Sequence, residues 1–378
     1  MKKNTTPKEF VDYGIGCFGF FPKREVPFKL SEKDFCADIR NYLDSIPAIS
    51  NIEISCSNPD NQITIKRPRR GFSEDLTFPP FSHSIKISFR LYIPARVQEE
   101  LFPSHRALKV SSENFLIHIQ PEFYSSVTFI EPIASKGSSR PSDSIVIVRE
   151  YLRKHAPKDN ILVQFDCLGP SPLHAKFHLI PKKKKSKVED NVLSVKRFEI
   201  KGYDKIFILY TPEYFQNIEQ VKMKFISCAA DELSVFYAIK MKSLKSIQLW
   251  SEIQKEFKHV LEDKDTTFYR KIVHSLRRGK HLKLLFSAIA NLEAHLIRQE
   301  EFTSRAIMHT YKKNTINLFQ PILENAIKEL PKYPTRPIIE LASFLEERQG
   351  RSIEMLIVLI SALIGGIAGS IITIFLSK

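Results

Sequence analysis

The chain has 378 residues, a formal net charge of +15 at pH 7, and hydrophobic and aromatic fractions of 43% and 11%. These values supply a folded core and exclude disordered, collagen-like and low-complexity proteins. The length has room for about two domains.

The N-terminus and the cysteines indicate a reducing compartment. The first residues, MKKNTTPKEFVDYG, contain no apolar stretch of the kind that a signal peptide needs. The five cysteines are odd in number, far apart in the sequence and without a C-x-x-C motif. This spacing argues against a disulfide scaffold and against a structural zinc site, and it predicts buried thiols that act as small apolar residues.

Residues 1–240 are predicted to form a cytosolic domain of mixed strands and helices. Residues 84–93 alternate apolar and polar side chains, which predicts a half-buried strand. Further strands are expected at 14–21, 114–120, 126–132, 160–168, 175–180 and 204–210, and residues 144–157 are interpreted as a short strand that runs into a helix. Because the strands outnumber the helices and their connections contain Pro and Ser, the expected fold class is α+β with a mixed sheet.

Helices dominate the pattern from residue 241 onward. One apolar stripe consists of Leu285, Ile289, Leu292 and Leu296, and a second of Ile316, Phe319, Leu323 and Leu330. Neither stripe lasts three heptads, so we expect ordinary core packing in a helical region at 241–336 rather than an intermolecular coiled coil. A juxtamembrane helix is expected at 337–354.

Residues 355–376 carry no charged side chain, which predicts one C-terminal transmembrane helix. At about 1.5 Å per residue, a helix of this length spans a hydrocarbon core of ~30 Å. Basic residues precede the segment and only Lys378 follows it, so the positive-inside rule predicts a tail-anchored protein with a cytoplasmic N-terminal domain. In a bacterium, that membrane would be the inner one.

Small residues recur along the same segment and favour association between copies. Ser361, Gly365 and Gly369 are spaced four apart, and Gly366 widens the face that they form. Helix backbones approach closely over such a face in lipid, which predicts a homo-oligomer that forms through this segment. The predicted partners are therefore other copies of the chain and the lipid bilayer. Gly is also common in membrane helices that do not associate, so this interpretation has a simple alternative.

Two basic clusters are the candidates for a binding surface. The sequence KRPRR occupies 66–70 and PKKKKSK occupies 181–187; their cations are Lys66, Arg67, Arg69, Arg70, Lys182, Lys183, Lys184, Lys185 and Lys187. Such clusters attract phosphates of nucleic acid or anionic lipid, or an acidic protein partner. The alternative is a pair of solvated loops, because no recognisable nucleic-acid-binding module accompanies them.

One stretch combines residue types that catalysis uses. FDCLGPSPLHAKFHL, at 165–179, brings Asp166, Ser171, His174 and His178 close together in sequence. No G-x-S-x-G elbow is present, and in a strand the two histidines lie about 13 Å apart, which is too far for a shared metal. A structural turn is therefore favoured, and no catalytic, cofactor-binding or metal-binding residue is assigned. The absence of catalytic motifs disfavours enzymatic activity without excluding it, since an active site can assemble from distant residues.

These features lead to three functional hypotheses. The first is a membrane effector of the toxin or antiphage-defence type, whose cytosolic domain senses a signal and whose associated spans perturb the membrane. The second is a tether or scaffold whose basic surface recruits a protein, a nucleic acid or an acidic lipid. The third is a membrane-anchored enzyme of unknown chemistry.

Overall fold

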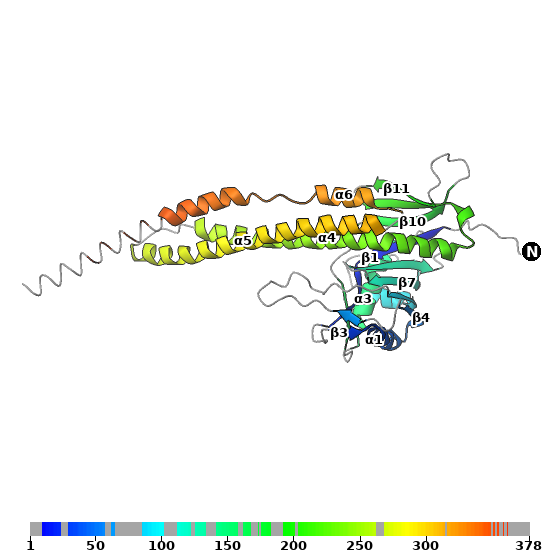
Figure 1. Ribbon diagram of the computed structural model, residues 1–378. Helices are drawn as coiled ribbons and strands as arrows, with labels where there is room; N and C mark the ends of the chain where they lie inside the picture. The colour runs from blue at the N-terminus through cyan, green and yellow to red at the C-terminus, as the bar shows by residue number, and fades with distance from the viewer. Residues whose placement is uncertain are drawn as a thin grey trace, which may run out of the picture. The chain divides into compact units, whose positions relative to one another are not determined.

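The computed structural model (Figure 1) divides into two compact units. The first comprises Met1–Met241 and Thr303–Glu329, and the second comprises Lys242–Phe302 and Leu330–Lys378. The residues that the structure describes are 10–23, 29–56, 62–64, 85–101, 112–121, 125–133, 141–157, 162–167, 173, 175–182, 192–200, 203–261, 268–313, 316–348, 351, 354, 358 and 361.

The first unit is built on an eight-stranded sheet with the order β11-β12-β10-β1-β8-β7-β6-β4. Its strands are β1 (Val11–Gly16), β4 (Ile49–Ser55), β6 (Lys86–Tyr92), β7 (Asn114–Pro121), β8 (Ser126–Ile133), β10 (Ala175–Pro181), β11 (Leu193–Ile200) and β12 (Tyr203–Tyr210). Neighbouring strands are antiparallel except for β10 and β12, which are parallel. Two smaller sheets pair β2 (Phe18–Pro22) with β9 (Val163–Cys167) and β3 (Lys29–Ser31) with β5 (Gln62–Thr64).

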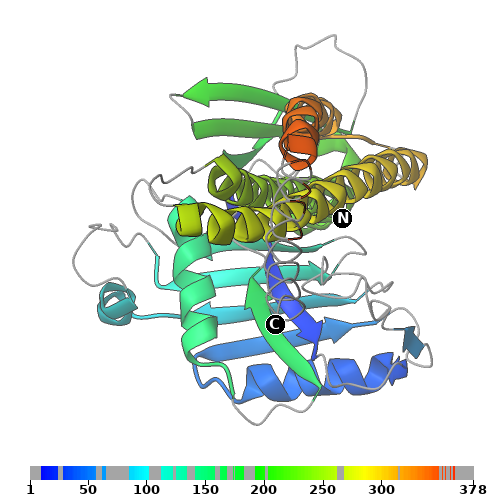
Figure 2. The ribbon, with the colours of Figure 1, turned by 90° about the vertical axis from the view of Figure 1, so that its left-hand side faces the viewer.

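Three helices lie between these strands in the sequence: α1 (Glu32–Asp44), α2 (Ala95–Leu101) and α3 (Pro141–Lys154). In Figure 2, α3 runs across the strands of the large sheet. Side chains from α1, α3, β2 and β9 form one apolar core with the sheet strands β6 and β7. The mixture of sheet and helices confirms the predicted α+β class.

The predicted strands at 114–120, 126–132, 175–180 and 204–210 are confirmed as β7, β8, β10 and β12, but the strand expected at the start of 144–157 is wrong. Those residues are helical from Pro141 onward. The run SIVIV has the β-branched composition of a strand, but Ile145, Val148 and Leu152 are spaced three and four apart and are all buried. The tertiary contacts of that helical face therefore outweigh the local β propensity.

The two ends of the large sheet bury opposite faces. Residues that pair across neighbouring strands point to the same side of a sheet, so one side can be followed through the register. On this side, Phe89 of β6, Ile117 of β7, Ile130 of β8 and Gly14 of β1 are successive neighbours. Asp12, two residues before Gly14, lies on the same side, and its successive neighbours are His178 of β10 and Phe207 of β12. This side is buried at Phe89, Ile117 and Ile130 but remains accessible at Asp12, His178 and Phe207.

The opposite side of the sheet shows the reverse pattern. At the β10–β12 end it is buried, through Phe177, Ile206 and Ile208, whereas at the β6 end it presents the exposed side chains of Lys86 and Arg90. Only the central strands β1 and β8 are largely buried on both sides. Each end of the sheet therefore has one accessible face, and the two accessible faces point in opposite directions.

The long helices follow the sheet in the sequence: a 3-10 turn η1 (Pro212–Tyr214), then α4 (Ile218–Leu261), α5 (Phe268–Lys313) and α6 (Gln320–Lys328). The start of α4 is capped by Asn217, whose Oδ1 accepts from the backbone N–H of Gln220 at 2.9 Å. The Gln220 side chain accepts in turn from the backbone N–H of Gln216 at 2.9 Å. This reciprocal capping fixes where α4 begins, and Phe225 in its second turn packs against Tyr13 and Phe129 of the sheet.

The second unit is helical. Its core is formed by side chains of α4 and α5, and they include the predicted stripe of Leu285, Ile289 and Leu292. Trp250 and Tyr333 add an aromatic contact with ring centroids 5.3 Å apart. The apolar stripe is thus ordinary core, as the sequence predicted, and residues 335–348 form a further helix.

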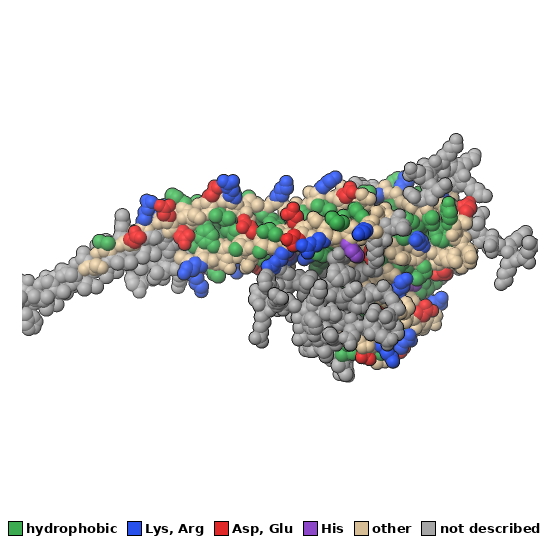
Figure 3. Space-filling view, in the orientation of Figure 1, with side chains coloured by type: hydrophobic (Ala, Val, Ile, Leu, Met, Phe, Trp, Pro, Cys, Tyr) green, Lys and Arg blue, Asp and Glu red, His purple; other side chains and the backbone are tan. Residues whose placement is uncertain are grey.

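The predicted transmembrane helix is contradicted. In the part of the chain that the structure describes, no helix is both long enough and apolar enough to cross a membrane. The longest described helices, α4 and α5, carry charged side chains at short intervals, among them Lys245, Glu252 and Lys255 in α4 and Glu293 and Arg298 in α5, and Figure 3 shows such side chains spread along the helices. These charges make burial of either helix in hydrocarbon unfavourable.

Of the predicted span 355–376, Val358 and Ser361 belong to the described residues, both exposed, and the others lie outside them. The tail-anchored topology and the membrane localisation were inferred from that span alone. Both are therefore corrected together with it.

Candidate nucleic-acid interface

Three aromatic rings form a row across the accessible face at the β10–β12–β11 end of the sheet. His178 of β10 stacks on Phe207 of β12, with ring centroids 5.1 Å apart and planes inclined by 26°. Phe207 meets Phe198 of β11 edge-on, with centroids 5.4 Å apart. Phe198 keeps 44% of its surface exposed.

Lysines flank each ring of this row. Lys176, Lys205 and Lys196 lie two residues from His178, Phe207 and Phe198 along their strands, and therefore on the same side of the sheet. The Lys196 ammonium lies 5.0 Å from the centroid of the Phe198 ring, a cation–π contact. We call the surface formed by Lys176, His178, Lys196, Phe198, Lys205 and Phe207 the platform.

One acidic side chain contacts the row. Asp12 of β1 approaches His178, with 2.7 Å between Asp12 Oδ1 and His178 Nδ1. This contact fixes the plane of the imidazole against Phe207. Among the described residues, no acidic side chain forms an ion pair with Lys176, Lys196 or Lys205. The nearby Arg197–Asp204 ion pair, at 2.6 Å, belongs to the opposite side of the sheet by its position in the strands.

The back of the platform is tightly packed. Leu179, Ile206, Ile208 and Tyr210 are buried there, and Phe177 meets Phe319 edge-on with ring centroids 6.0 Å apart. This packing holds β10 and β12 in place, so the accessible rings on their other side have fixed positions. A preformed surface loses less conformational entropy when a ligand binds.

A buried carboxylate holds Phe319 in place. Glu232 of α4 is 0% exposed, and its Oε2 accepts from the backbone N–H groups of Leu318 and Phe319 at 2.7 and 3.0 Å. It thereby caps the start of α6, where the Phe319 side chain offers no cap of its own. Burial raises the pKa of Glu232 to about 7, against the opposing effect of these two hydrogen bonds.

The accessible face at the other end of the sheet has different chemistry. There Lys86 and Arg90 alternate with Ser88, and Glu53 of β4 accepts from the Ser88 hydroxyl at 3.4 Å. Tyr92 is 46% exposed, and its hydroxyl donates to Glu113 at 3.3 Å. Both charge signs and a satisfied phenol are typical of a solvated sheet face.

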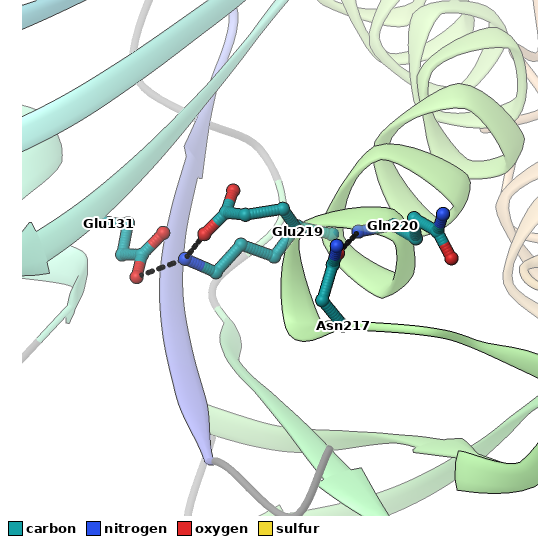
Figure 4. Close-up of polar contacts among 5 residues, drawn as sticks. Glu131, Asn217, Glu219 and Gln220 are labelled. Atoms are coloured by element: carbon teal, nitrogen blue, oxygen red, sulfur yellow. Dashed lines mark hydrogen bonds and ion pairs between the residues drawn. The ribbon is translucent and has the colours of Figure 1, made fainter. Parts of the chain in front are cut away.

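A second polar cluster lies at the start of α4 (Figure 4). The Lys222 ammonium lies 2.9 Å from a carboxylate oxygen of Glu131 and 2.9 Å from one of Glu219. Burial lowers the pKa of Lys222, but its hydrogen bonds to the two carboxylates outweigh this effect, and the net shift is upward. The ammonium is therefore charged, and it fastens α4 to β8.

Two titratable neighbours of this cluster are held neutral. Burial lowers the pKa of His118 to about 4, and burial followed by the charge of Glu131 raises the pKa of Tyr13 well above its ordinary value. Nothing here provides a metal site: within the described residues, no group of three or more His, Cys, Asp or Glu side chains is arranged to hold a metal ion. We interpret the cluster as structural.

The site residues predicted from the sequence lie mostly outside the described residues. Of the basic clusters, only Lys182 is described; it directly follows β10, and its backbone N–H donates to the carbonyl of Tyr210 at 2.8 Å. Lys66, Arg67, Arg69, Arg70, Lys183, Lys184, Lys185 and Lys187 are outside, as are Gly365, Gly366 and Gly369. Ser171 and His174 are outside as well, whereas His178 lies in the row of rings.

Sequence reasoning missed the platform. The alternation Lys196, Phe198 in LSVKRFEI and Lys205, Phe207 in DKIFILY is a usable signal, because both pairs place a cation and a ring on one side of a strand. What the sequence did not show is that β12 lies between β10 and β11.

Comparisons with known proteins add no functional information. No family model matches the chain, and neither a curated protein nor a solved structure is similar to it. The function is therefore argued from the residues of the chain itself.

Proposed function

We propose that the protein binds single-stranded nucleic acid on the platform. The observation that carries the proposal is the row of three accessible rings, His178, Phe207 and Phe198, on three adjacent strands with a lysine beside each ring. The activity proposed is binding, and no catalytic step is assigned to the platform.

The two components of the platform match the two components of a nucleic-acid strand. Unpaired bases stack on aromatic side chains, which contributes about 1–3 kcal/mol per base. Lysines contact the phosphates that separate the bases and release their counterions. A duplex hides its base faces in its own stack, so the rings favour a single strand. The formal net charge of +15 also favours an anionic polymer.

Two other partners fit part of the platform. An anionic lipid surface would use the lysines but has no planar group for the rings, and an acidic peptide has the charge but stacks only where it carries aromatic residues. Both partners serve as outcomes of the test.

The test is fluorescence anisotropy with the full chain and labelled 12-nucleotide single strands of DNA and RNA, with a duplex of the same sequence as competitor. Phe198→Ala should weaken binding about 5- to 150-fold, as the loss of one stacking contact implies. The matched control is Tyr92→Ala, which removes an equally exposed ring from the other accessible face of the sheet and should leave the affinity unchanged.

Three outcomes would contradict the proposal. These are equal losses for Phe198→Ala and Tyr92→Ala, a preference for the duplex, and binding to vesicles with 30% anionic lipid but not to single strands. The last outcome would indicate that the lysines serve a lipid surface and that the rings do not take part.

A further inference from the structure

Two histidines from different helices meet in the second unit. His259 lies in the last turn of α4, and His281 lies in α5. The centroids of their rings are 4.9 Å apart, and the ring planes are inclined by 32°. Val260 and Leu282, the next residues of the two helices, are buried in the helical core. The packing of the helices therefore holds the two imidazoles together.

A carboxylate orients one of the two rings. Glu256 lies one turn before His259 in α4, and its Oε2 is 2.8 Å from Nδ1 of His281. A carboxylate accepts hydrogen bonds, so Nδ1 of His281 carries the proton. The lone pair of this imidazole is then on Nε2, and a histidine that donates from its other nitrogen to a carboxylate is well suited to bind a metal through it.

The separation of the rings matches that of two imidazoles on one metal ion. A Zn–N bond is about 2.0–2.1 Å long, and the centroid of the ring lies about 1.2 Å beyond the nitrogen. At N–Zn–N angles between about 90° and 109°, the centroids of two such rings are about 4.5–5.2 Å apart. The separation of 4.9 Å falls within this range, so the helices already hold the rings as far apart as a shared ion requires.

The three side chains are partly open to solvent. His281 and Glu256 keep 31% and 19% of their side-chain surface exposed, and His259 is half-buried. An ion and its water ligands can therefore reach the rings. Within the part of the chain that the structure describes, no three or more His, Cys, Asp or Glu side chains are arranged around one ion. The two imidazoles would therefore be the protein ligands, and water would complete the coordination.

We propose that His259 and His281 bind a divalent transition-metal ion, with Zn²⁺ as the expected ion, and that Glu256 positions His281 through its Nδ1–H. Imidazole is a preferred ligand of Zn²⁺, Cu²⁺ and Ni²⁺, whereas Mg²⁺ and Ca²⁺ prefer oxygen ligands. An ion held by both rings would fasten the end of α4 to α5. No reaction is assigned to the site. The simpler alternative is a hydrogen-bonded pair of histidines that binds no ion.

The test is isothermal titration calorimetry of the full chain with ZnCl₂, after removal of metal by a chelator, and with MgCl₂ as the comparison. His259→Ala and His281→Ala should each abolish one Zn²⁺ site. Glu256→Gln keeps both ligands and should weaken binding about 10- to 100-fold, as expected when a carboxylate that orients a ligating histidine is lost. His309→Ala is the matched control, because it removes an exposed histidine from the same helix. Circular dichroism checks that the variants fold.

A second measurement tests which nitrogen binds the ion. In NMR spectra of the chain labelled with ¹⁵N-histidine, Zn²⁺ should shift the Nε2 signal of His281 while its Nδ1 remains protonated. The signals of His309 should not move.

The proposal is overturned if the chain binds no Zn²⁺, or if His259→Ala and His281→Ala bind it as tightly as the unmodified chain does. An equal loss of affinity in His309→Ala would overturn it as well, because binding would then follow the number of histidines rather than this pair. Binding that depends on both histidines but not on Glu256 would retain the metal site and refute the positioning role of the carboxylate.

Discussion

The two accessible faces of the large sheet have the same geometry and different chemistry. At the β4–β6–β7 end, Lys86 and Arg90 share the surface with Glu53 and Glu113, and the exposed ring of Tyr92 has a polar partner. At the β10–β12–β11 end, His178 stacks on Phe207, Phe207 meets Phe198 edge-on, and each ring is flanked by a lysine.

This difference distinguishes a solvated face from the face on which we propose that a ligand binds. A half-buried sheet needs only polar side chains on its outer side to remain soluble, and the β4–β6–β7 end meets that need. Exposed phenyl rings add nothing to solubility, and burying them in a ligand is favourable. Substitutions at the two ends and at the centre of the sheet test whether this difference is real.

The largest effect should come from the buried side of each end. Phe177→Ala should lower the free energy of unfolding by about 3–5 kcal/mol, because it leaves a cavity behind the platform. Phe89→Ala removes an equally buried ring from the opposite side of the sheet at the other end and should cost a similar amount.

Urea denaturation measures both losses. If the side chains behind the platform can shift to fill the cavity, the free energy of unfolding will fall much less for Phe177→Ala than for Phe89→Ala. The rings would then lack the rigid support inferred from the contact between Phe177 and Phe319.

The second largest loss of stability is expected at the centre of the sheet, between the two ends that bury opposite faces. Lys222→Met leaves Glu131 and Glu219 without their shared cation and should destabilise the protein by about 3 kcal/mol. Lys222→Met combined with Glu131→Gln removes the buried charge from both partners and should recover part of the loss. Thermal unfolding compares the two variants; equal destabilisation by both would refute the assignment of Lys222 as an anchor of α4.

Glu232 predicts a pH dependence behind the platform. Its pKa rises from 4.5 to about 7 on folding, so the stability that it contributes is fully present below pH 4.5 and has been lost once the pH has risen through about 7. At about 1.4 kcal/mol for each pKa unit, the rise from 4.5 to about 7 corresponds to about 3 kcal/mol. Glu232→Gln removes the ionisation and should therefore gain stability over the unmodified protein between pH 5 and 8.

Urea titrations at several pH values measure this gain. Glu329→Gln is the control, because the Glu329 carboxylate is exposed in a surface ion pair with Lys240. The free energy of unfolding of this variant should differ little from that of the unmodified protein at each pH. A constant difference for Glu232→Gln as well would show that this carboxylate does not titrate near neutral pH.

How far the sequence could predict these regions depends on whether the information is local. The alternation at residues 84–93 and the stripe at Leu285, Ile289 and Leu292 lie within single elements, and both predictions are confirmed. The platform requires β10, β12 and β11 as neighbours in that order. Contacts of this kind arise from tertiary packing, which no periodicity in one segment encodes.

The basic clusters show the opposite error. The run at 181–187 was predicted as part of a binding surface because its charges lie close together in the sequence. Charge density within one segment does not indicate which surface that segment adjoins. The three lysines of the platform lie on different strands and come together through strand pairing. Composition alone therefore favours an anionic partner. The sheet register is needed to show which lysines lie together on one surface.

The smallest predicted effect tests the lysines against their counterparts at the other end. Lys196→Gln and Lys205→Gln together should reduce the slope of log K against log salt by about 1.4, since each phosphate contact on a single strand contributes roughly 0.7. Lys86→Gln and Arg90→Gln remove the same charge from the other accessible face and should change the slope little, because Glu53 and Glu113 remain there. Anisotropy titrations from 50 to 300 mM salt would measure both slopes. Equal reductions would mean that the strand responds to the total charge of the protein, and that the rings alone distinguish the platform from the rest of the surface.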